Sequence, residues 1–281
     1  MSNEKLIYNG ELLEGSANGI PAGDRGYQFG DGLFETIRII NGNVCFFDAH
    51  LNRLKLGLRS LKIKYAADFD FGRLLNEIQS LIELNNIKEG GRCRLTVTRD
   101  SGGYYRPKNE VGFNYLIQVM PVEQNYFELN EVGLNIDVYK ERVKQITPTS
   151  NYKTLNCELY IMASIFSENT GMDDVLVQND QDAIIESTNS NLFIVSNSVL
   201  YTVPLVDGCV GGTMRMQVIN LALANNYRVY ETSFKPRNLL VADEVFLTNA
   251  SSGIRWVQSY RQKKYIKEIT PRLMELVNAS V

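Results

Sequence analysis

Short stretches of alternating apolar and polar residues dominate the first 121 residues, with two longer stretches of helical periodicity between them. The alternating stretches predict β-strands at residues 5–12, 33–40, 44–47, 92–99 and 113–120. A helix is expected to begin at Asp48, whose side chain would cap it, because four leucines between positions 51 and 61 share one face. A second amphipathic helix is expected over 71–84. These elements predict a small α/β unit.

The second half of the chain is richer in strand patterns. They cover residues 132–139, 175–178, 183–186, 191–195, 199–203, 227–234, 244–248 and 254–259. Helices are expected before Gly171, from Met216 to Ala224 and after Pro271. The polar stretch 122–130 is typical of a domain connector. The pattern therefore predicts a two-domain α/β (α+β) protein, with a small N-terminal α/β domain at 1–121, a connector at 122–130 and a larger β-rich α/β domain at 131–281.

Composition narrows the classes of function. The 281 residues carry a formal net charge of −3, with both signs spread along the chain, so neither nucleic acid nor a membrane surface is an expected partner. No apolar stretch approaches membrane-spanning length and no signal-peptide pattern precedes the first strand, so we expect a cytoplasmic protein. Four widely spaced cysteines are expected to be reduced thiols. The single histidine, His50, gives little support to a metal centre or a Ser-His-Asp triad.

One lysine stands where a reactive amine is expected. Lys153 follows the irregular segment 147–152 and precedes a helical pattern. Two chemistries fit this position. Ser150-x-x-Lys153 matches the Ser-x-x-Lys of serine acyl-transferases, and Ser187-Thr-Asn189 imitates a second element of that set, although no Lys-Thr-Gly follows. Alternatively, the amine itself attacks a carbonyl, as a Schiff-base lysine does, and residues that hold a cofactor are then needed elsewhere.

Several polar or glycine-rich segments are candidates for holding such a cofactor. Glu186 ends a predicted strand and faces a small polar loop. The glycine-rich turn 207–212 leads into a helix start, where backbone N–H groups and the helix dipole favour a phosphate. Arg53 lies off the apolar face of its helix, so it is either solvated or reaches a phosphate. A pyridoxal-phosphate enzyme needs an amine for the aldehyde, an acid beside the pyridine nitrogen and donors for the phosphate, and each has a candidate here.

With these segments in this order, the sequence resembles the class-IV aminotransferase family, the fold-type IV pyridoxal-phosphate enzymes, over nearly the whole chain. The resemblance implies that Lys153 is the Schiff-base lysine, that Glu186 is the partner of the pyridine nitrogen and that Arg53, in the pattern Asp-x-His-x-x-Arg, binds the phosphate. Further cofactor-binding positions implied by the family are Thr213, Met214, Asn249, Ala250 and Ser251. The resemblance also implies the cofactor pyridoxal 5′-phosphate, a small-molecule amino substrate and a homodimer; no metal is expected.

Details of the sequence distinguish subgroups of the family. Branched-chain aminotransferases carry a tyrosine five residues after the lysine, where this chain has Glu158. D-amino-acid aminotransferases carry a tyrosine at the position of Phe34, and they carry an Arg-x-His carboxylate clamp after the strand that ends here at Arg99. This chain lacks that histidine. Both transaminase subgroups are therefore less similar to it.

The segments 28–38 and 101–103 are most similar to those of aminodeoxychorismate lyases, and Lys153-Thr-Leu-Asn156 is shared by lyases and D-amino-acid enzymes. The lyases release pyruvate from 4-amino-4-deoxychorismate to give 4-aminobenzoate for folate synthesis. We expect this activity; the alternative is an amino-acid aminotransferase of the branched-chain or D-amino-acid type that uses 2-oxoglutarate. The substrate-binding residues expected from the resemblance are Phe29, Arg38, Arg99 and Arg106.

Overall fold

The structure is a computed structural model that describes residues 4–15, 20–109 and 111–281. The described residues divide into two compact units. The first unit extends to Tyr126 and also includes residues 152–156 and the last residue, whereas the second comprises 127–151 and 157–280. The division after Tyr126 falls within the polar stretch 122–130. Residues 152–156 belong to the first unit, whereas the sequence analysis places them in the second domain.

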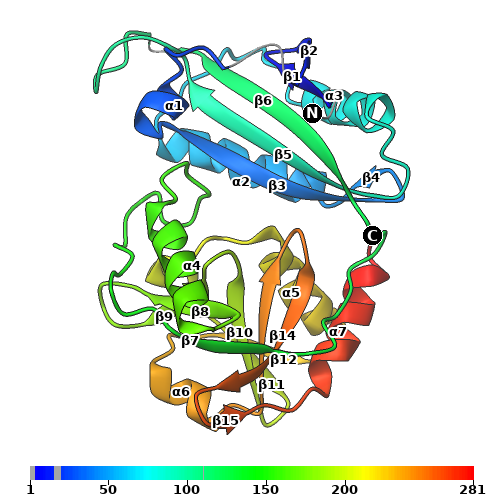
Figure 1. Ribbon diagram of the computed structural model, residues 1–281, viewed down its shortest axis with the longest axis vertical. Coiled ribbons are helices and arrows are strands. Elements are labelled where there is room, and N and C mark those ends of the chain that lie inside the picture. Colours follow the sequence, from blue (N-terminus) through cyan, green and yellow to red (C-terminus); the bar gives the residue numbers. More distant parts are fainter. Residues whose placement is uncertain (1–3, 16–19, 110) are drawn as a thin grey trace. The chain divides into compact units, whose positions relative to one another are not determined.

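An antiparallel sheet forms the first unit, with the strand order β2-β1-β6-β5-β3-β4 (Figure 1). The strands are β1 Lys5–Tyr8, β2 Glu11–Glu14, β3 Gly32–Ile40, β4 Asn43–Val44, β5 Gly90–Arg99 and β6 Phe113–Val122. The helices are α1 Arg25–Phe29, α2 Phe47–Ser60 and α3 Gly72–Leu84. Helix α2 packs on β3 and α3 packs on β6. Their apolar faces and the alternate residues of the strands form one core.

The connection between β3 and α2 differs from the expected strand and cap. The predicted strand 44–47 shortens to β4, because Phe46 has a φ of 54° and reverses the chain, so that Phe47 begins the helix. Asp48 therefore lies in the first turn of α2 and is not its N-cap. A left-handed conformation is rare for a bulky aromatic residue, so residue propensities do not predict this turn.

Strands β10, β13, β14, β7, β8 and β9 of the second unit pair in a closed ring, and β11 and β12 extend the sheet from β10. Their order is β12-β11-β10-β13-β14-β7-β8-β9, and β9 also pairs with β10. The closing register places Glu186 of β9 opposite Asn191 of β10. The strands are β7 Leu134–Val138, β8 Asp174–Gln178, β9 Ile184–Ser187, β10 Asn191–Ser196, β11 Val199–Thr202, β12 Arg228–Glu231, β13 Glu244–Asn249 and β14 Gly253–Tyr260, with β15 Lys263–Lys264 paired to β14. Ring closure fixes the position of Glu186, because its strand is paired on both sides.

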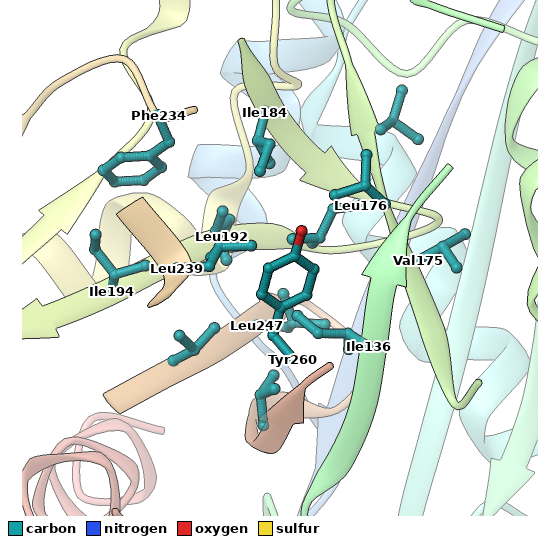
Figure 2. Close-up of a cluster of buried hydrophobic side chains, with 14 of the residues drawn as sticks. Ile136, Val175, Leu176, Ile184, Leu192, Ile194, Phe234, Leu239, Leu247 and Tyr260 are labelled. Atoms are coloured by element: carbon teal, nitrogen blue, oxygen red, sulfur yellow. The ribbon is translucent and has the colours of Figure 1, made fainter. Parts of the chain in front are cut away.

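Apolar side chains from these strands make the core of the second unit (Figure 2). Leu176, Ile184 and Tyr260 are completely buried in it. The helices of this unit are α4 Glu158–Thr170, η1 Leu205–Asp207, α5 Thr213–Ala224, α6 Pro236–Val241 and α7 Ile269–Asn278. No helix within the described ranges combines the length and apolar character that a membrane crossing requires. The cysteines are free thiols, and all except the partly buried Cys157 are buried.

The hydrogen bonds between Glu244 of β13 and the start of helix α7 predict an effect on the stability of the second unit. Glu244 of β13 is buried, and its carboxylate accepts hydrogen bonds from the N–H groups of Ile269 (2.7 Å) and Thr270 (3.0 Å) and from the Thr270 hydroxyl (2.7 Å). We expect Glu244→Gln to lower the free energy of unfolding by about 1–3 kcal/mol, because an amide leaves one of these donors without an acceptor. Urea unfolding would measure the change. Glu275→Gln, on the exposed side of α7, is the control and should change stability by less than about 1 kcal/mol.

Candidate active site

Lys153 lies in an extended segment that pairs with the start of β3. The Phe34 N–H donates to the Lys153 carbonyl at 2.9 Å, and the Leu155 N–H donates to the Gly32 carbonyl at 3.0 Å. This edge of β3 is open to the segment because β4 pairs only with the other end of the strand, at Ile39 and Ile40. The Lys153 ammonium group lies 4.7 Å from the centre of the Phe34 ring. The lysine is thus held by the sheet, five residues before helix α4 begins.

A buried ionic cluster lies next to β3 in the same unit. Glu35 of β3 is 2% exposed, and its carboxylate contacts His50 and Arg53 of α2. The Arg53 Nε donates to Glu35 Oε1 at 2.8 Å, and Arg53 Nη2 makes a second, short contact with Oε2. His50 Nδ1 lies 2.7 Å from the same Oε2. Arg53 is therefore fixed by a bidentate ion pair and is not a solvated side chain.

Charge and burial set the protonation of this cluster. Burial alone would raise the pKa of Glu35, but the Arg53 charge and the hydrogen bonds from His50 and Arg53 lower it to about 2. Burial lowers the pKa of His50; its contacts with Glu35 oppose this shift, and the charges of Arg53 and Lys153 add to it. At neutral pH the cluster thus consists of an anionic Glu35, a cationic Arg53 and a neutral His50. Because the charge of Lys153 acts on His50, the Lys153 amine lies near this cluster.

The sequence predicted a cofactor-binding role for Arg53 and no role for Glu35 or His50. The spacing of His50 and Arg53, three residues apart on one helix, was visible in the sequence, and such residues lie on one helix face. Glu35 had no comparable signal, because its neighbours Phe34 and Thr36 fit an ordinary strand. Only the packing of α2 on β3 shows that the glutamate points into the protein.

In the second unit, Glu186 is 3% exposed and accepts hydrogen bonds at both carboxylate oxygens. Oε1 accepts from Lys144 Nζ and from the Tyr160 hydroxyl, each at 2.7 Å. Oε2 accepts from the Val210 backbone N–H at 2.7 Å. The strand-end glutamate therefore does not face water, and an acidic group with a fixed orientation stands at the closure of the ring.

The glycine-rich turn continues directly from Val210 into helix α5. No side chain caps this helix at Gly212, and its first residues are the buried Thr213 and Met214. A Cβ atom on Gly212 would lie 1.9 Å from the side-chain Oδ1 of Asn191, so a larger residue here would displace the Asn191 amide. Asn191 in turn donates to the Val210 carbonyl at 2.7 Å. The turn before this helix N-terminus donates to Glu186 through Val210, and a helix N-terminus suits an anion.

The loop after β13 is tied to the polar loop after β9. Asn249 Nδ2 donates to Ser190 Oγ at 2.9 Å and to Asn189 Oδ1 at 3.3 Å. Asn249 Oδ1 accepts from the backbone N–H groups of Ser251 and Ser252. The Ser251 N–H is thus already bonded within its loop. Of the phosphate donors expected here, the Ser251 hydroxyl and the backbone of Ala250 fit that role better than the Ser251 N–H.

Arg38, expected to bind substrate, has a different environment. Its buried guanidinium group contacts the backbone carbonyls of Gln124 and, at 3.4 Å, Tyr126. These contacts tie β3 to the chain segment that follows β6. Arg38 Nη2 thus holds the end of the first unit, whereas the buried Arg38 Nε has no hydrogen-bond partner among the described residues, and substrate binding by Arg38 stays a prediction.

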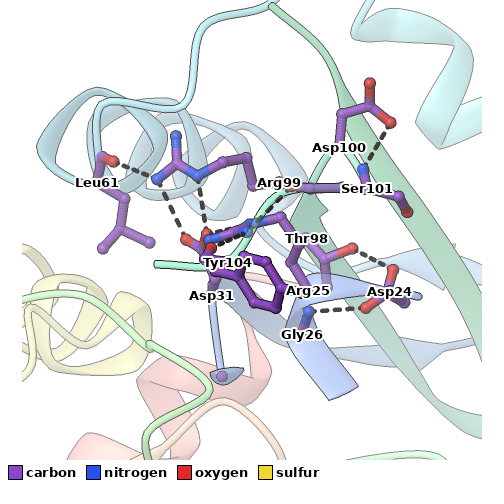
Figure 3. A network of polar contacts seen from close by, with 12 residues as sticks. Asp24, Arg25, Gly26, Asp31, Leu61, Thr98, Arg99, Asp100, Ser101 and Tyr104 are labelled. Atoms are coloured by element: carbon purple, nitrogen blue, oxygen red, sulfur yellow. Dashed lines mark hydrogen bonds and ion pairs between the residues drawn. The ribbon is translucent and has the colours of Figure 1, made fainter. Parts of the chain in front are cut away.

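Arg99 is part of a polar network centred on Asp31 (Figure 3). Its Nε and Nη2 donate to the Asp31 carboxylate at 2.8 and 3.1 Å, and its Nη groups also donate to the carbonyls of Leu61 and Lys62. Arg25 donates from Nε to Asp31 at 2.9 Å. The two guanidinium groups outweigh the effect of burial and lower the pKa of Asp31. A substrate carboxylate could engage Arg99 only in competition with Asp31.

The other two expected substrate residues lie near this network. The Phe29 ring is in contact with the Arg25 guanidinium group, 4.9 Å away, and with the Tyr105 ring, 5.8 Å between centroids. Arg25 also donates to the carbonyl of Tyr104 at 2.6 Å, which holds the loop after β5. Arg106 is exposed on that loop. Of the three expected arginines, Arg106 is the one that the loop presents to solvent.

Comparison with known proteins identifies relatives along most of the chain. The family model "Amino-transferase class IV" matches residues 32–260. A D-alanine aminotransferase from Bacillus licheniformis is 28% identical over 262 residues, which cover 89% of this chain and 86% of that protein. An aminodeoxychorismate lyase from Vibrio harveyi is also 28% identical, over 84% of this chain and 85% of that protein.

Solved structures share the fold. A branched-chain amino acid aminotransferase from Escherichia coli superimposes with a TM-score of 0.88 at 20% identity, covering 98% of this chain and 93% of that one. A hypothetical aminotransferase from Mycobacterium tuberculosis in a PLP-bound form has a TM-score of 0.83 at 19% identity, covering 99% and 98%. These similarities are evidence for the fold alone.

The buried Glu35–Arg53 pair predicts a large effect on stability. Glu35→Gln leaves the Arg53 charge buried without its counterion, so we expect a loss of about 3–5 kcal/mol in the free energy of unfolding at neutral pH. Urea unfolding followed by circular dichroism would measure it. Glu158→Gln, which removes an exposed partner of Arg142, is the matched control and should cost less than about 1 kcal/mol.

The Glu35–Arg53 pair also predicts that the free energy of unfolding depends on pH. Because the pKa of Glu35 is about 2 in the folded protein and about 4.3 in an unfolded chain, its contribution is complete above the unfolded value and is lost as the pH falls toward 2. The stability difference between the wild type and Glu35→Gln should therefore shrink as the pH is lowered through this window. A difference that stays constant would contradict the assignment.

Proposed function

Because the chain belongs to the amino-transferase class IV family, whose enzymes depend on pyridoxal phosphate, we propose that it is a 4-amino-4-deoxychorismate lyase that releases pyruvate and 4-aminobenzoate. The proposal rests on the way the first unit uses Arg99. Its guanidinium group is bound to Asp31 and to the carbonyls of Leu61 and Lys62. An arginine held in this way does not provide the carboxylate clamp of a D-amino-acid transaminase.

The residues of each unit fit the cofactor. In the second unit, the buried carboxylate of Glu186 suits the pyridine nitrogen, and the N-terminus of α5, at Thr213 and Met214, suits the phosphate. In the first unit, Lys153 supplies the amine and Arg53, fixed by Glu35, supplies a cation for the phosphate. When bound, the cofactor supplies a ring that accepts the electron pair released at the carbon bearing the substrate amine.

Lys153 has two tasks in this proposal. Its amine holds the cofactor before the substrate arrives, and once displaced by the substrate amine it takes the proton from the amine-bearing carbon. The bond between the substrate ring and the enolpyruvyl oxygen then breaks, the ring becomes aromatic, and the released enolpyruvate takes up a proton to become pyruvate. The neutral His50, near Lys153, adds no positive charge that would oppose protonation of the amine.

Two further positions support the lyase over the transaminases. Phe34 packs against the Lys153 ammonium group and offers no hydroxyl, where D-amino-acid enzymes have a tyrosine. Glu158, where branched-chain enzymes have a tyrosine, is exposed and pairs with Arg142 at 2.8 Å. Neither position carries the phenol that the transaminases use. We assign Arg106, on the loop after β5, to a substrate carboxylate.

An amino-acid transaminase is the second candidate. It is favoured by the D-alanine aminotransferase relative, which is as similar to this chain as the lyase relative is. Lys153 and Glu186 would do the same work in both reactions. The difference lies in where the proton goes, because a transaminase returns it to the cofactor and then needs a keto acid such as 2-oxoglutarate.

An assay of the cofactor-loaded protein separates the two. We expect 4-amino-4-deoxychorismate to yield 4-aminobenzoate and pyruvate in equal amounts, without an added keto acid, and Lys153→Ala to lower the rate by at least about 1,000-fold because it removes both the amine and the base. Product formation would be followed by chromatography.

D-alanine, branched-chain amino acids and 2-oxoglutarate form the parallel assay. Rapid amino transfer there, together with no release of 4-aminobenzoate, would overturn the lyase proposal and establish the transaminase. Arg106→Ala tests the substrate-binding assignment within the lyase reaction: we expect KM to rise about tenfold or more, since a charge-assisted contact is lost. An unchanged KM would exclude Arg106 from the site.

A further inference from the structure

Glu186 is held by donors from three separate segments of the second unit. Lys144 comes from the segment after β7, Tyr160 from α4, and Val210 from the turn before α5. A carboxylate accepts about four hydrogen bonds, two at each oxygen. Within residues 4–15, 20–109 and 111–281, Oε1 accepts two, from Lys144 and Tyr160, whereas Oε2 accepts one, from Val210. The remaining acceptor position therefore lies on Oε2, and the orientation of the carboxylate is set before any ligand binds.

Lys144 is itself anchored at both ends. Its backbone N–H donates to the Gln178 carbonyl at 2.9 Å, and its Nζ donates to the Ser150 carbonyl at 2.9 Å as well as to Glu186. Its side chain is 14% exposed, in contrast to the exposed ion pairs of the same unit. The ammonium group is therefore held by two acceptors, and its ion pair with Glu186 lies in a poorly solvated environment.

Two other titratable groups near Glu186, Tyr160 and Cys209, carry no charge at neutral pH. Burial and the Glu186 charge raise the pKa of Tyr160 well above its usual value, so Tyr160 acts as a neutral donor. Burial raises the pKa of the Cys209 thiol to about 12. Arg215 and Asp207 also act on Cys209, where Arg215 lowers the pKa and Asp207 raises it. Among the residues that the structure describes, Lys144 forms the ion pair with Glu186, at 2.7 Å.

We propose that Lys144 is a positioning residue that shares the charge of Glu186 and so limits how firmly this carboxylate holds a proton on the ring nitrogen of the cofactor. The inference rests on the proposed cofactor role of Glu186. A protonated ring nitrogen would be a second cation on one carboxylate, and the ammonium group of Lys144 disfavours it by repulsion. The ring nitrogen should thus lose its proton at a lower pH than a glutamate without Lys144 would allow. Tyr160 and Val210 contribute orientation without this charge effect.

Two substitutions separate charge from hydrogen bonding. Lys144→Gln keeps a side-chain donor for Glu186 and removes the charge, and Lys144→Arg keeps both. The protein would be loaded with cofactor labelled with nitrogen-15 at the ring nitrogen, and its chemical shift would be followed by NMR as the pH is raised. We expect the deprotonation midpoint to move upward by roughly 1 to 3 pH units in Lys144→Gln, the size of shift that one neighbouring charge produces, and to stay unchanged in Lys144→Arg.

Tyr160→Phe is the control for loosening of the carboxylate, because it removes a donor to the same oxygen and leaves the charge in place. Its midpoint should move less than that of Lys144→Gln. An unchanged midpoint in Lys144→Gln, equal shifts in Lys144→Gln and Lys144→Arg, or a wild-type ring nitrogen that stays protonated at the highest pH the folded protein tolerates would each overturn the inference.

Binding of the cofactor to Lys153 is measured in a separate experiment. Absorbance of the wild-type protein shows whether Lys153 forms an imine with pyridoxal phosphate. If no imine forms, the proposed function fails and the charge-sharing inference fails with it. If the imine forms and only the midpoints disagree with expectation, the proposed function stands and the role of Lys144 is overturned.

Discussion

Burying a carboxylate away from water is the constraint on which the polar centre of each unit depends. An ionised glutamate removed from solvent must be paired and hydrogen-bonded, or it is protonated instead. Glu35 in the first unit recruits Arg53 and His50 from α2. Glu186 in the second recruits Lys144, Tyr160 and the Val210 N–H. The donors to Glu186 come from three segments 24 to 42 residues away in sequence, whereas those to Glu35 both come from α2, so each glutamate fixes the side chains of the elements packed against it.

The two clusters differ in what they leave available. Glu35 is fully engaged by two side chains, and its effect is to hold Arg53, a cation, in a defined place. Glu186 retains an acceptor position at Oε2 beside a helix N-terminus. In the proposed function, Glu35 holds Arg53 as a cation for the phosphate of the cofactor, and Glu186 is the anion for its basic ring nitrogen.

Much of this arrangement could be predicted from local sequence, and the rest depends on packing. Lys153, Glu186 and the glycine-rich turn stood out because each has an unusual local pattern. The helix periodicities of α2 and α3 were equally clear. Glu35 was missed because a single glutamate in a strand has no pattern of its own. The assignment of Lys153 to the first unit was missed because it depends on the open edge of β3, which in turn depends on the short β4 and the left-handed Phe46. The ion pair between Asp31 and Arg99 was also not predicted, because it depends on how the chain packs.

We propose Lys153 as the residue that binds the cofactor covalently. Reducing the pyridoxal-phosphate-loaded protein with borohydride, followed by digestion and mass spectrometry, tests it directly, because reduction converts an imine into a stable bond. We expect the cofactor label on the peptide containing Lys153 and no label in Lys153→Ala. A label on another lysine, such as Lys144, or no label on the wild-type protein would contradict it.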